Sequence, residues 1–507
     1  MKTRYFSLLL REGMDLASTT TLILCTILGF IFLSWGKVHQ KRRSLPPGPA
    51  PLPFFGTLRK IKPHALYKTF VQLSKEYGPV FTVWMGTSPV VVLCGYDMVK
   101  DALVNHGEEF SGRAFSASNQ KVTGGNGVIN SNGPEWQVLR RFAITTLRNF
   151  GMGKRSMEER VQEEARHLLK AIKDTQGEAF DPMMSLQSAA ANMICLVMFG
   201  ERFDYSDKAF LHILHTIDQY FIFIRSFIGQ LYNSIPKIMD FLPGPHHRIL
   251  EETLSVRYFV QEKIDWHKKT IDYESPRDYI DCFLAKKEKN ESWFTDENLV
   301  ASTFDMFIAG TETTTGSIQF SLLVMAKYPD VQEKVQQEID HVVGPKRMPG
   351  IEDRVKMPYT NAVILEIQRF VDIVPMALPH SMTRDTEFHG YIIPKGTVVI
   401  PILTSVMHDP KQWETADEFN PQHFLDENGL LRNRAAFMPF SAGKRMCPGE
   451  GLARMEIFLF LAVLLQNFTF QPVDDPASLD LAVMRREFRN KGLSFQLRAV
   501  TRQHAPA

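Results

Sequence analysis

One cysteine near the C-terminal end lies in a loop rich in glycine and basic side chains. The loop runs Phe440-Ser-Ala-Gly443-Lys-Arg445-Met-Cys447-Pro-Gly, and an apolar stretch from Leu452 to Phe470 follows it and predicts a helix. Glycine lets backbone N–H groups approach a sulfur atom, and a helix N-terminus and basic side chains favour its anionic form. Such a sulfur suits metal ligation, and haem iron accepts an axial thiolate. A buried structural cysteine, or a redox thiol in a turn, is the alternative for an isolated cysteine.

The spacing within this loop carries a family resemblance. Phe440, Gly443, Arg445, Cys447 and Gly449 occupy the fixed positions of the pattern Phe-x-x-Gly-x-Arg-x-Cys-x-Gly. The loop thereby resembles the haem-thiolate signature of the cytochrome P450 superfamily, and the resemblance extends over nearly the whole chain to the microsomal family-two type. It implies a mainly α fold with small β-sheets and haem b (iron protoporphyrin IX) with Cys447 as the axial ligand. Phe440, Gly443 and Arg445 would then contact the cofactor.

The overall composition is that of one large globular chain. It has 507 residues, 44% of them hydrophobic, and a net charge of +2, which gives no sign of nucleic-acid binding. Five scattered cysteines without a CxxC pair argue against a disulfide framework and for a reducing compartment.

The N-terminal region predicts a membrane anchor. Leu16 to Trp35 carries no charge and is long enough to span a bilayer, and basic residues follow it. We favour a retained anchor over a cleaved signal peptide, because no small-residue cleavage site follows. The expected organisation is an anchor at 1–36, a basic and proline-rich linker at 37–53, and a catalytic domain at 54–507. The family resemblance implies the endoplasmic reticulum membrane. The four basic residues after the segment, against three before it, and the cysteine pattern favour a catalytic domain on its cytoplasmic face.

Hydrophobic periodicity and chain-breaking residues predict the main elements. Thr295 is a predicted N-cap, and the helix it opens continues to Lys327, where Tyr328-Pro329 ends it. Other predicted helices lie within Met157–His267, Asp330–Val342 and Pro358–Val371, and strands lie within Tyr77–Gly95, Thr386–Ile393 and Thr397–Leu403. The apolar segment Tyr220–Leu242 fits either membrane contact or core packing.

The long helix contains the segment Ala309-Gly-Thr-Glu312-Thr313-Thr. Glycine and threonine are poor helix formers, and Thr313 can donate a hydrogen bond to the Ala309 carbonyl four residues earlier. This loosening would form a groove over a metal, where Glu312 and Thr313 supply an acid and an alcohol for proton delivery. A tolerated imperfection in a core helix is the alternative. The segment resembles the acid–alcohol motif of the monooxygenases.

Further site residues follow from the resemblance. Glu366 and Arg369 share one helical face, and with His423 they resemble the structural Glu-x-x-Arg lock of the family. Cations and donors for the haem propionates would be Arg113, Trp136, Arg140 and His380, together with Arg445. The substrate pocket would be lined by Phe115, Asp305, Ile308, Ala309, Val374, Met376 and Leu378. The charged run Arg485–Arg489 either faces outward or binds an anionic substrate head.

The implied reaction is insertion of one oxygen atom from O2 into lipophilic small molecules such as xenobiotics, fatty acids or steroids. No nicotinamide or flavin motif occurs in the chain, so NADPH electrons would come through a cytochrome P450 reductase, with cytochrome b5 as a second donor. A proximal docking face would comprise Arg140, Arg141, Lys154, Arg155, Arg432, Arg434 and Lys444. Three rivals stay open: a reductase-independent haem-thiolate isomerase of peroxides, a non-catalytic haem-binding protein, and a membrane protein using Cys447 as a plain nucleophile.

Overall fold

The computed structural model describes residues 21, 36, 42–52, 56–60, 65–150, 155–476, 479–491 and 493–503. Apart from residues 21 and 36, the predicted anchor at 1–36 lies outside this set. No helix within the described part is long and apolar enough to cross a membrane.

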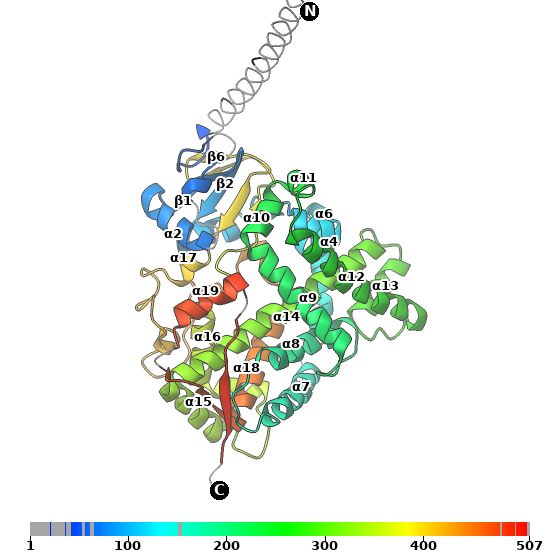
Figure 1. Ribbon diagram of the computed structural model, residues 1–507, viewed down its shortest axis with the longest axis vertical. Coiled ribbons are helices and arrows are strands. Elements are labelled where there is room, and N and C mark those ends of the chain that lie inside the picture. Colours follow the sequence, from blue (N-terminus) through cyan, green and yellow to red (C-terminus); the bar gives the residue numbers. More distant parts are fainter. Residues whose placement is uncertain are drawn as a thin grey trace, which may run out of the picture.

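The predicted long helix is the centre of a mainly helical fold. Helix α14 spans Asp296–Lys327, and the Thr295 hydroxyl accepts its capping hydrogen bond from the Asn298 N–H. It packs against α8 (Met183–Met198), α12 (Pro245–Thr270), α16 (Pro358–Val371) and α18 (Glu450–Asn467), and it crosses the middle of the molecule (Figure 1). Because neighbours cover it on several sides, α14 is apolar around most of its circumference instead of along one stripe.

The other helices surround this centre. They are α2 (Leu66–Tyr77), α3 (Tyr96–Lys100), α4 (Ala117–Thr123), α5 (Gly127–Asn130), α6 (Gly133–Asn149), α7 (Arg155–Lys173), α9 (Lys208–Arg225), α10 (Phe227–Ser234), α11 (Pro236–Met239), α13 (Tyr279–Glu288), α15 (Pro329–Val342), α17 (Thr404–Met407) and α19 (Leu481–Lys491). The boundaries of α16 are those predicted. The stretch predicted as one helix to Phe470 instead ends at Asn467, because Phe468 begins strand β8.

The strands form one five-stranded sheet and two hairpins. The sheet has the order β1 (Val80–Met85), β2 (Ser88–Leu93), β7 (Val398–Pro401), β4 (His380–Ser381) and β3 (Gly112–Arg113). The hairpins are β5 (Thr386–Phe388) with β6 (Tyr391–Ile393), and β8 (Phe468–Pro472) with β9 (Leu497–Thr501). In the antiparallel pair β3–β4, Arg113 lies opposite His380. The sheet therefore brings together two predicted site residues that are 267 positions apart in the chain.

The described part of the proline-rich linker is docked on the sheet. The Pro47 carbonyl accepts from the Thr82 N–H at 2.8 Å, and the Ser44 carbonyl accepts from the Ile392 N–H at 3.2 Å. A Cβ on Gly48 would lie 1.9 Å from the Thr82 carbonyl oxygen. Residues 44–48 are thus fixed against β1 and β6.

Candidate active site

A cavity of about 300 Å³ lies between the central helix α14, helix α6 and the cysteine loop. The predicted residues that line it are Arg113, Trp136, Arg140, Asp305, Ala309, Thr313, Val374, Leu378, His380, Phe440, Arg445 and Cys447. The cavity thereby brings together predicted residues from five separate segments of the chain.

The Cys447 sulfur lies at the start of α18, as the glycine-rich loop predicted. Backbone N–H groups of Gly449 and Glu450 point at it. Burial nevertheless raises the pKa of the Cys447 thiol, and these N–H groups and the Arg140 guanidinium only partly oppose that effect. Lys444 does not assist, because its ammonium pairs with Glu108 at the surface. Within the protein alone, burial therefore disfavours the anionic form of this sulfur.

Gly443 has a packing role in this loop. Its φ is +71°, and a Cβ there would lie 1.7 Å from the Leu103 carbonyl oxygen. The residue is not among those that line the cavity, and its contact with a cofactor stays a prediction. The glycine instead lets the cysteine loop close against residues 101–105.

Three guanidinium groups gather on one side of the cavity. Burial and mutual repulsion lower the pKa of Arg445 to about 8 and that of Arg113 to about 10, and burial lowers the pKa of Arg140. Their donors reach mainly carbonyl oxygens, such as Ser111 for Arg445 at 2.7 Å and Leu378 for Arg113 at 2.8 Å. Among the described residues, none of the three lies within ion-pair distance of a carboxylate. Buried positive charge of this kind favours an anionic ligand.

Two further donors flank the guanidinium cluster. The Trp136 indole N–H is buried and has no acceptor among the described residues, and the Arg445 guanidinium lies 3.7 Å from the Trp136 ring centre. Burial and the neighbouring Arg113 lower the pKa of His380 to about 3, while its Nδ1 lies 2.6 Å from the Phe110 carbonyl. An apolar cavity with a thiol at one wall and a cationic cluster beside it fits haem, whose two propionates would be held by these groups.

The opposite wall is formed by α14. The Thr313 hydroxyl donates to the Ala309 carbonyl at 2.8 Å, the back-bond expected from the sequence, and Thr313 lines the cavity. Glu312 does not line it. Successive helical residues are about 100° apart, and the Glu312 carboxylate points to α9, where it meets Arg225 at 3.3 Å. The alcohol and the acid thus face different sides of the helix.

Comparison with known proteins agrees with this arrangement. The sequence model of the family "Cytochrome P450" matches residues 46–489. The chain belongs to the cytochrome P450 family. It is 47% identical to cytochrome P450 2C8 of Homo sapiens over 94% of this chain and 98% of that protein. It is 46% identical to cytochrome P450 2G1 of Oryctolagus cuniculus, covering 96% and 99%, and 48% identical to cytochrome P450 2F2 of Mus musculus, covering 89% and 93%. The P450 is therefore of the microsomal family-two type.

Three residues expected in the substrate pocket of this P450 lie elsewhere. Phe115 is 69% exposed. Ile308 packs into the helical core, and Met376 packs against β1 and β2. Asp305 lines the cavity, but its Oδ2 accepts from the Ile129 N–H at 2.9 Å, and burial raises its pKa to about 7. Asp305 therefore anchors the 127–130 segment over the cavity.

The charged run after Arg485 does not form the cavity wall. The Arg485 guanidinium donates to the Phe370 carbonyl and lies 3.2 Å from the His408 ring nitrogen. Phe488 is buried, and its ring occupies the space beside Gly316 of α14. None of the residues 485–488 is among those that line the cavity. Their charges accordingly offer no site for an anionic substrate head there.

The predicted structural lock is fully buried. Arg369 binds both carboxylate oxygens of Glu366 at 2.7 Å and donates to the carbonyls of Met407, Ala416 and Glu418. His423 Nδ1 lies 3.2 Å from both Glu366 oxygens. Its Nε2 lies 3.2 Å from the Thr415 backbone nitrogen. The lock therefore joins Glu366 to both Arg369 and His423.

Sequence reasoning missed a buried acid in the cavity wall. Glu456 of α18 lines the cavity, and burial raises its pKa to about 8 despite a hydrogen bond from Thr314. Gln368 lines the same cavity, and its buried Oε1 has no hydrogen-bond partner among the described residues. A single carboxyl inside the apolar run Leu452–Phe470 is the signal that would have identified Glu456.

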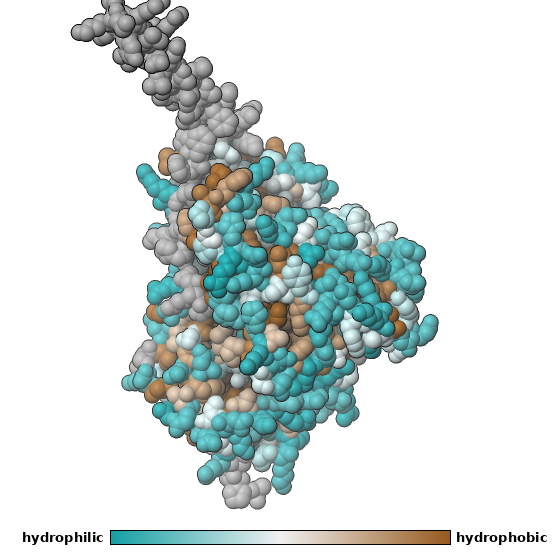
Figure 2. Space-filling view, turned by 45° about the vertical axis from the view of Figure 1, so that its right-hand side comes forward, coloured by the Kyte–Doolittle hydropathy of each residue, from teal (hydrophilic) through white to brown (hydrophobic). Residues whose placement is uncertain are grey.

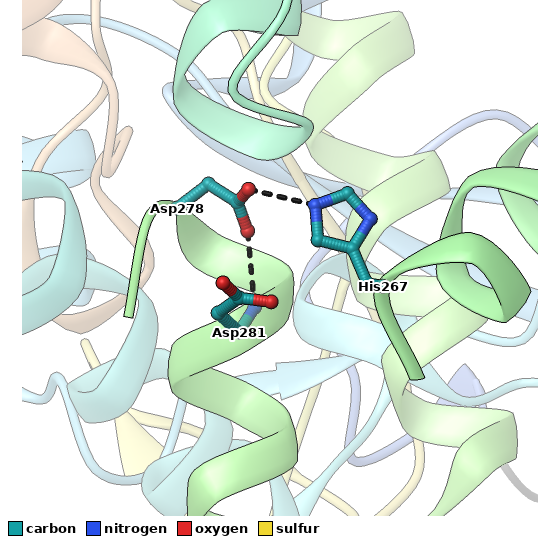
Figure 3. A group of neighbouring side chains, drawn as sticks. All are labelled: His267, Asp278 and Asp281. Carbon is teal, nitrogen blue, oxygen red and sulfur yellow. Dashed lines mark hydrogen bonds and ion pairs between the residues drawn. The ribbon is translucent and has the colours of Figure 1, made fainter. Parts of the chain in front are cut away.

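A second group of ligand-type side chains joins α12 to α13. His267, Asp278 and Asp281 point toward one another (Figure 3). The His267 Nε2 lies 2.7 Å from Asp278, and its Nδ1 lies 2.7 Å from the Lys263 carbonyl. Asp281 is held by the Arg277 guanidinium at 2.6 Å. Both ring nitrogens and both carboxylates are thus engaged within the protein, and we interpret the group as a structural clasp.

Proposed function

We propose that this P450 is a haem-thiolate monooxygenase of lipophilic small molecules that receives NADPH electrons from a separate reductase. The observation that carries the proposal is the cavity that joins Cys447, the cationic cluster and Thr313. When bound, haem supplies oxygen activation, with the axial thiolate donating electron density to the iron.

The chain's own residues would position the cofactor and move protons. Arg113, Arg140 and Arg445 would hold the propionate charges, and Cys447 would supply a sulfur ligand to the iron. Thr313 presents a hydroxyl at the cavity wall, already bonded to the Ala309 carbonyl. We propose that this hydroxyl, at the cavity wall, helps to hold a proton-donating water.

The cavity wall supports an apolar substrate. Ala309, Val374, Leu378, Leu403 and Ile373 all contribute carbon surface to it. Pockets of this kind bind apolar molecules and orient them by a few polar groups. Xenobiotics, fatty acids and steroids remain the candidate substrates, and the cavity wall provides no separate anion site outside the cationic cluster.

A short path to the surface supports electron delivery near Cys447. Met446, the neighbouring residue, is 38% exposed. Arg432 and Arg434 share Glu414 as their partner, at 3.0 and 2.9 Å, so part of the basic face is neutralised internally. We propose docking of a reductase, and of cytochrome b5 as a second donor, around Met446.

An apolar surface supports association with the endoplasmic reticulum membrane, with the catalytic domain on its cytoplasmic face. Phe241 is 89% exposed, Ile238 57% and Phe227 53%, in and beside α10 and α11. Ile392 of β6 is 56% exposed, and Figure 1 shows β6 and α11 at the same end of the molecule. Hydrophobic side chains gather at this upper end in Figure 2. Large exposed apolar groups at one end favour contact with lipid.

The test combines a spectrum with turnover. Purified protein, once reduced and exposed to carbon monoxide, should show the absorption of a thiolate-bound haem, and reductase with NADPH should yield an oxygenated product from apolar substrates. Haem without such turnover would indicate a haem-binding protein. Rearrangement of peroxides without reductase would indicate an isomerase, and absence of haem would refute the proposal.

A further inference from the structure

A serine in the cysteine loop carries a buried hydroxyl group that has no hydrogen-bond partner among the described residues. Ser441 belongs to the cavity wall, and its Oγ is buried. The hydroxyls of Thr313 and Ser317, on the facing helix, instead donate to the carbonyls of Ala309 and Thr313, both at 2.8 Å. Burying a hydroxyl without a hydrogen bond costs free energy. An unpaired hydroxyl in a cavity wall therefore indicates a partner that the cavity itself receives.

The backbone at this serine has a conformation that favours glycine. The φ of Ser441 is +63°, in the left-handed region, where a Cβ is sterically disfavoured. The loop holds this conformation, because the Ser441 N–H donates to the Met438 carbonyl at 3.1 Å and the Cys447 N–H donates to the Phe440 carbonyl at 3.0 Å. Strain of this kind collects at functional sites. The side chain of Ser441 is thus present at a cost to the backbone, which a bond from its hydroxyl would offset.

The chemistry of haem limits what this hydroxyl can bind. The four ring nitrogens bind the iron, so the two propionate carboxylates are the hydrogen-bond acceptors of the cofactor. A hydroxyl donates to an ionised carboxylate through a short, charge-assisted bond. Arg445, a member of the cationic cluster, lies four residues further along the same loop and also lines the cavity. The cysteine loop thereby brings a cation and a neutral donor to one cavity wall.

We propose that Ser441 is a further haem-binding residue of this P450, whose hydroxyl donates a hydrogen bond to one propionate. This rests on the haem site of the proposed function. The guanidinium groups of Arg113, Arg140 and Arg445 repel one another in their buried cluster. A neutral hydroxyl adds a donor for the carboxylate without adding to that repulsion. Ser441 therefore complements the arginines, and it ties the loop that carries Cys447 to the edge of the cofactor.

The test compares Ser441→Ala and Ser441→Gly in the full-length haem-loaded protein. Alanine keeps the Cβ and removes the oxygen alone, whereas glycine removes the whole side chain and suits the positive φ. Both variants should transfer haem to an acceptor apoprotein about tenfold faster or more, as expected when one hydrogen bond to a charged group is lost. In both, the resonance Raman band of propionate bending should shift, because this band responds to hydrogen bonds at the carboxylates.

Ser188→Ala is the matched control. The Ser188 hydroxyl, on α8, is also buried without a partner among the described residues, but Ser188 is not one of the residues that line the cavity. Its removal should leave the transfer rate and the propionate band unchanged. An equal acceleration in Ser188→Ala would assign the effect to a general loss of stability and would overturn the proposal.

Three other results would also overturn the role of Ser441. They are an unchanged transfer rate and propionate band in both Ser441 variants, acceleration in Ser441→Gly alone, which would indicate backbone freedom, and a shift of the iron–sulfur stretching band without a propionate shift, which would place the hydroxyl at Cys447. Each of these leaves the haem site of the unmodified protein intact. Absence of haem from the unmodified protein would instead refute the proposed function, and the role of Ser441 with it.

Discussion

The cysteine loop offers a sharp test of how close packing holds the thiol in place. Gly443→Ala should lower the free energy of unfolding in two ways. The alanine must adopt a positive φ of +71°, and its Cβ would lie 1.7 Å from the Leu103 carbonyl oxygen. The first costs about 1 kcal/mol for a non-glycine residue. The second requires a backbone shift of the loop or of residues 101–105, and overpacking of this kind costs about 1–3 kcal/mol, sometimes more. We expect a total destabilisation of about 3 kcal/mol or more.

Gly429→Ala isolates the first of these costs. Its φ is +75°, but a Cβ there meets no atom within 4 Å. It should therefore lower the free energy of unfolding by only about 1 kcal/mol. The assay is urea unfolding followed by circular dichroism, with the carbon monoxide spectrum measured in parallel. We expect Gly443→Ala to lose both stability and the thiolate-type spectrum, and equal effects of the two substitutions would refute the packing argument.

Three further expectations concern other buried charges. Glu366→Gln should lower the free energy of unfolding by about 3–5 kcal/mol, because Arg369 is left buried and unpaired, whereas Glu414→Gln, at a 56% exposed side chain, should cost under about 1 kcal/mol in the same urea titration. Burial lowers the pKa of His267, but the bond and the charge of Asp278 outweigh burial, so the pKa is raised overall. The contribution of this clasp to the free energy of unfolding is therefore complete below about pH 6.5 and is lost as the pH rises through the raised pKa. In His267→Gln, the unfolding temperature should accordingly fall less with rising pH than in the unmodified protein. An equal fall in both proteins would contradict this role of the clasp. Arg445→Leu should speed transfer of haem to an acceptor apoprotein by about tenfold or more, since one charge-assisted bond to a propionate is lost, and an unchanged rate would exclude that contact.

Much of the local structure could be predicted from sequence periodicity and capping. The bounds of α16 and the Thr295 cap of α14 were predicted correctly, because a proline start, a threonine cap and a Tyr-Pro stop act within a few residues. The strands β1 and β2 were predicted within Tyr77–Gly95 for the same reason, and they pair as an antiparallel hairpin. The end of α18 was predicted three residues too late, because an apolar residue such as Phe468 fits a helix or a strand equally well. The pairing of Phe468 with Thr501 places it in a strand.

The direction of individual side chains could not be predicted. Glu312 and Thr313 are neighbours in sequence, yet Glu312 pairs with Arg225 of α9 and Thr313 lines the cavity. Phe115, Ile308 and Met376 are apolar and near the right motifs, but their directions depend on which elements cover them. Glu456 was missed because its burial results from packing of α18 on α14.

The sequence by itself determined the thiol loop, the elements around it and the residue types the site requires, because these depend on spacing along one segment. Only the tertiary structure decided which charges meet. Among the described residues, three arginines converge with no carboxylate at ion-pair distance, and Glu312 meets Arg225 of α9, because helices and strands far apart in the chain come together and exclude water between them. Exclusion of water is what changes an ordinary side chain into one with a shifted protonation state.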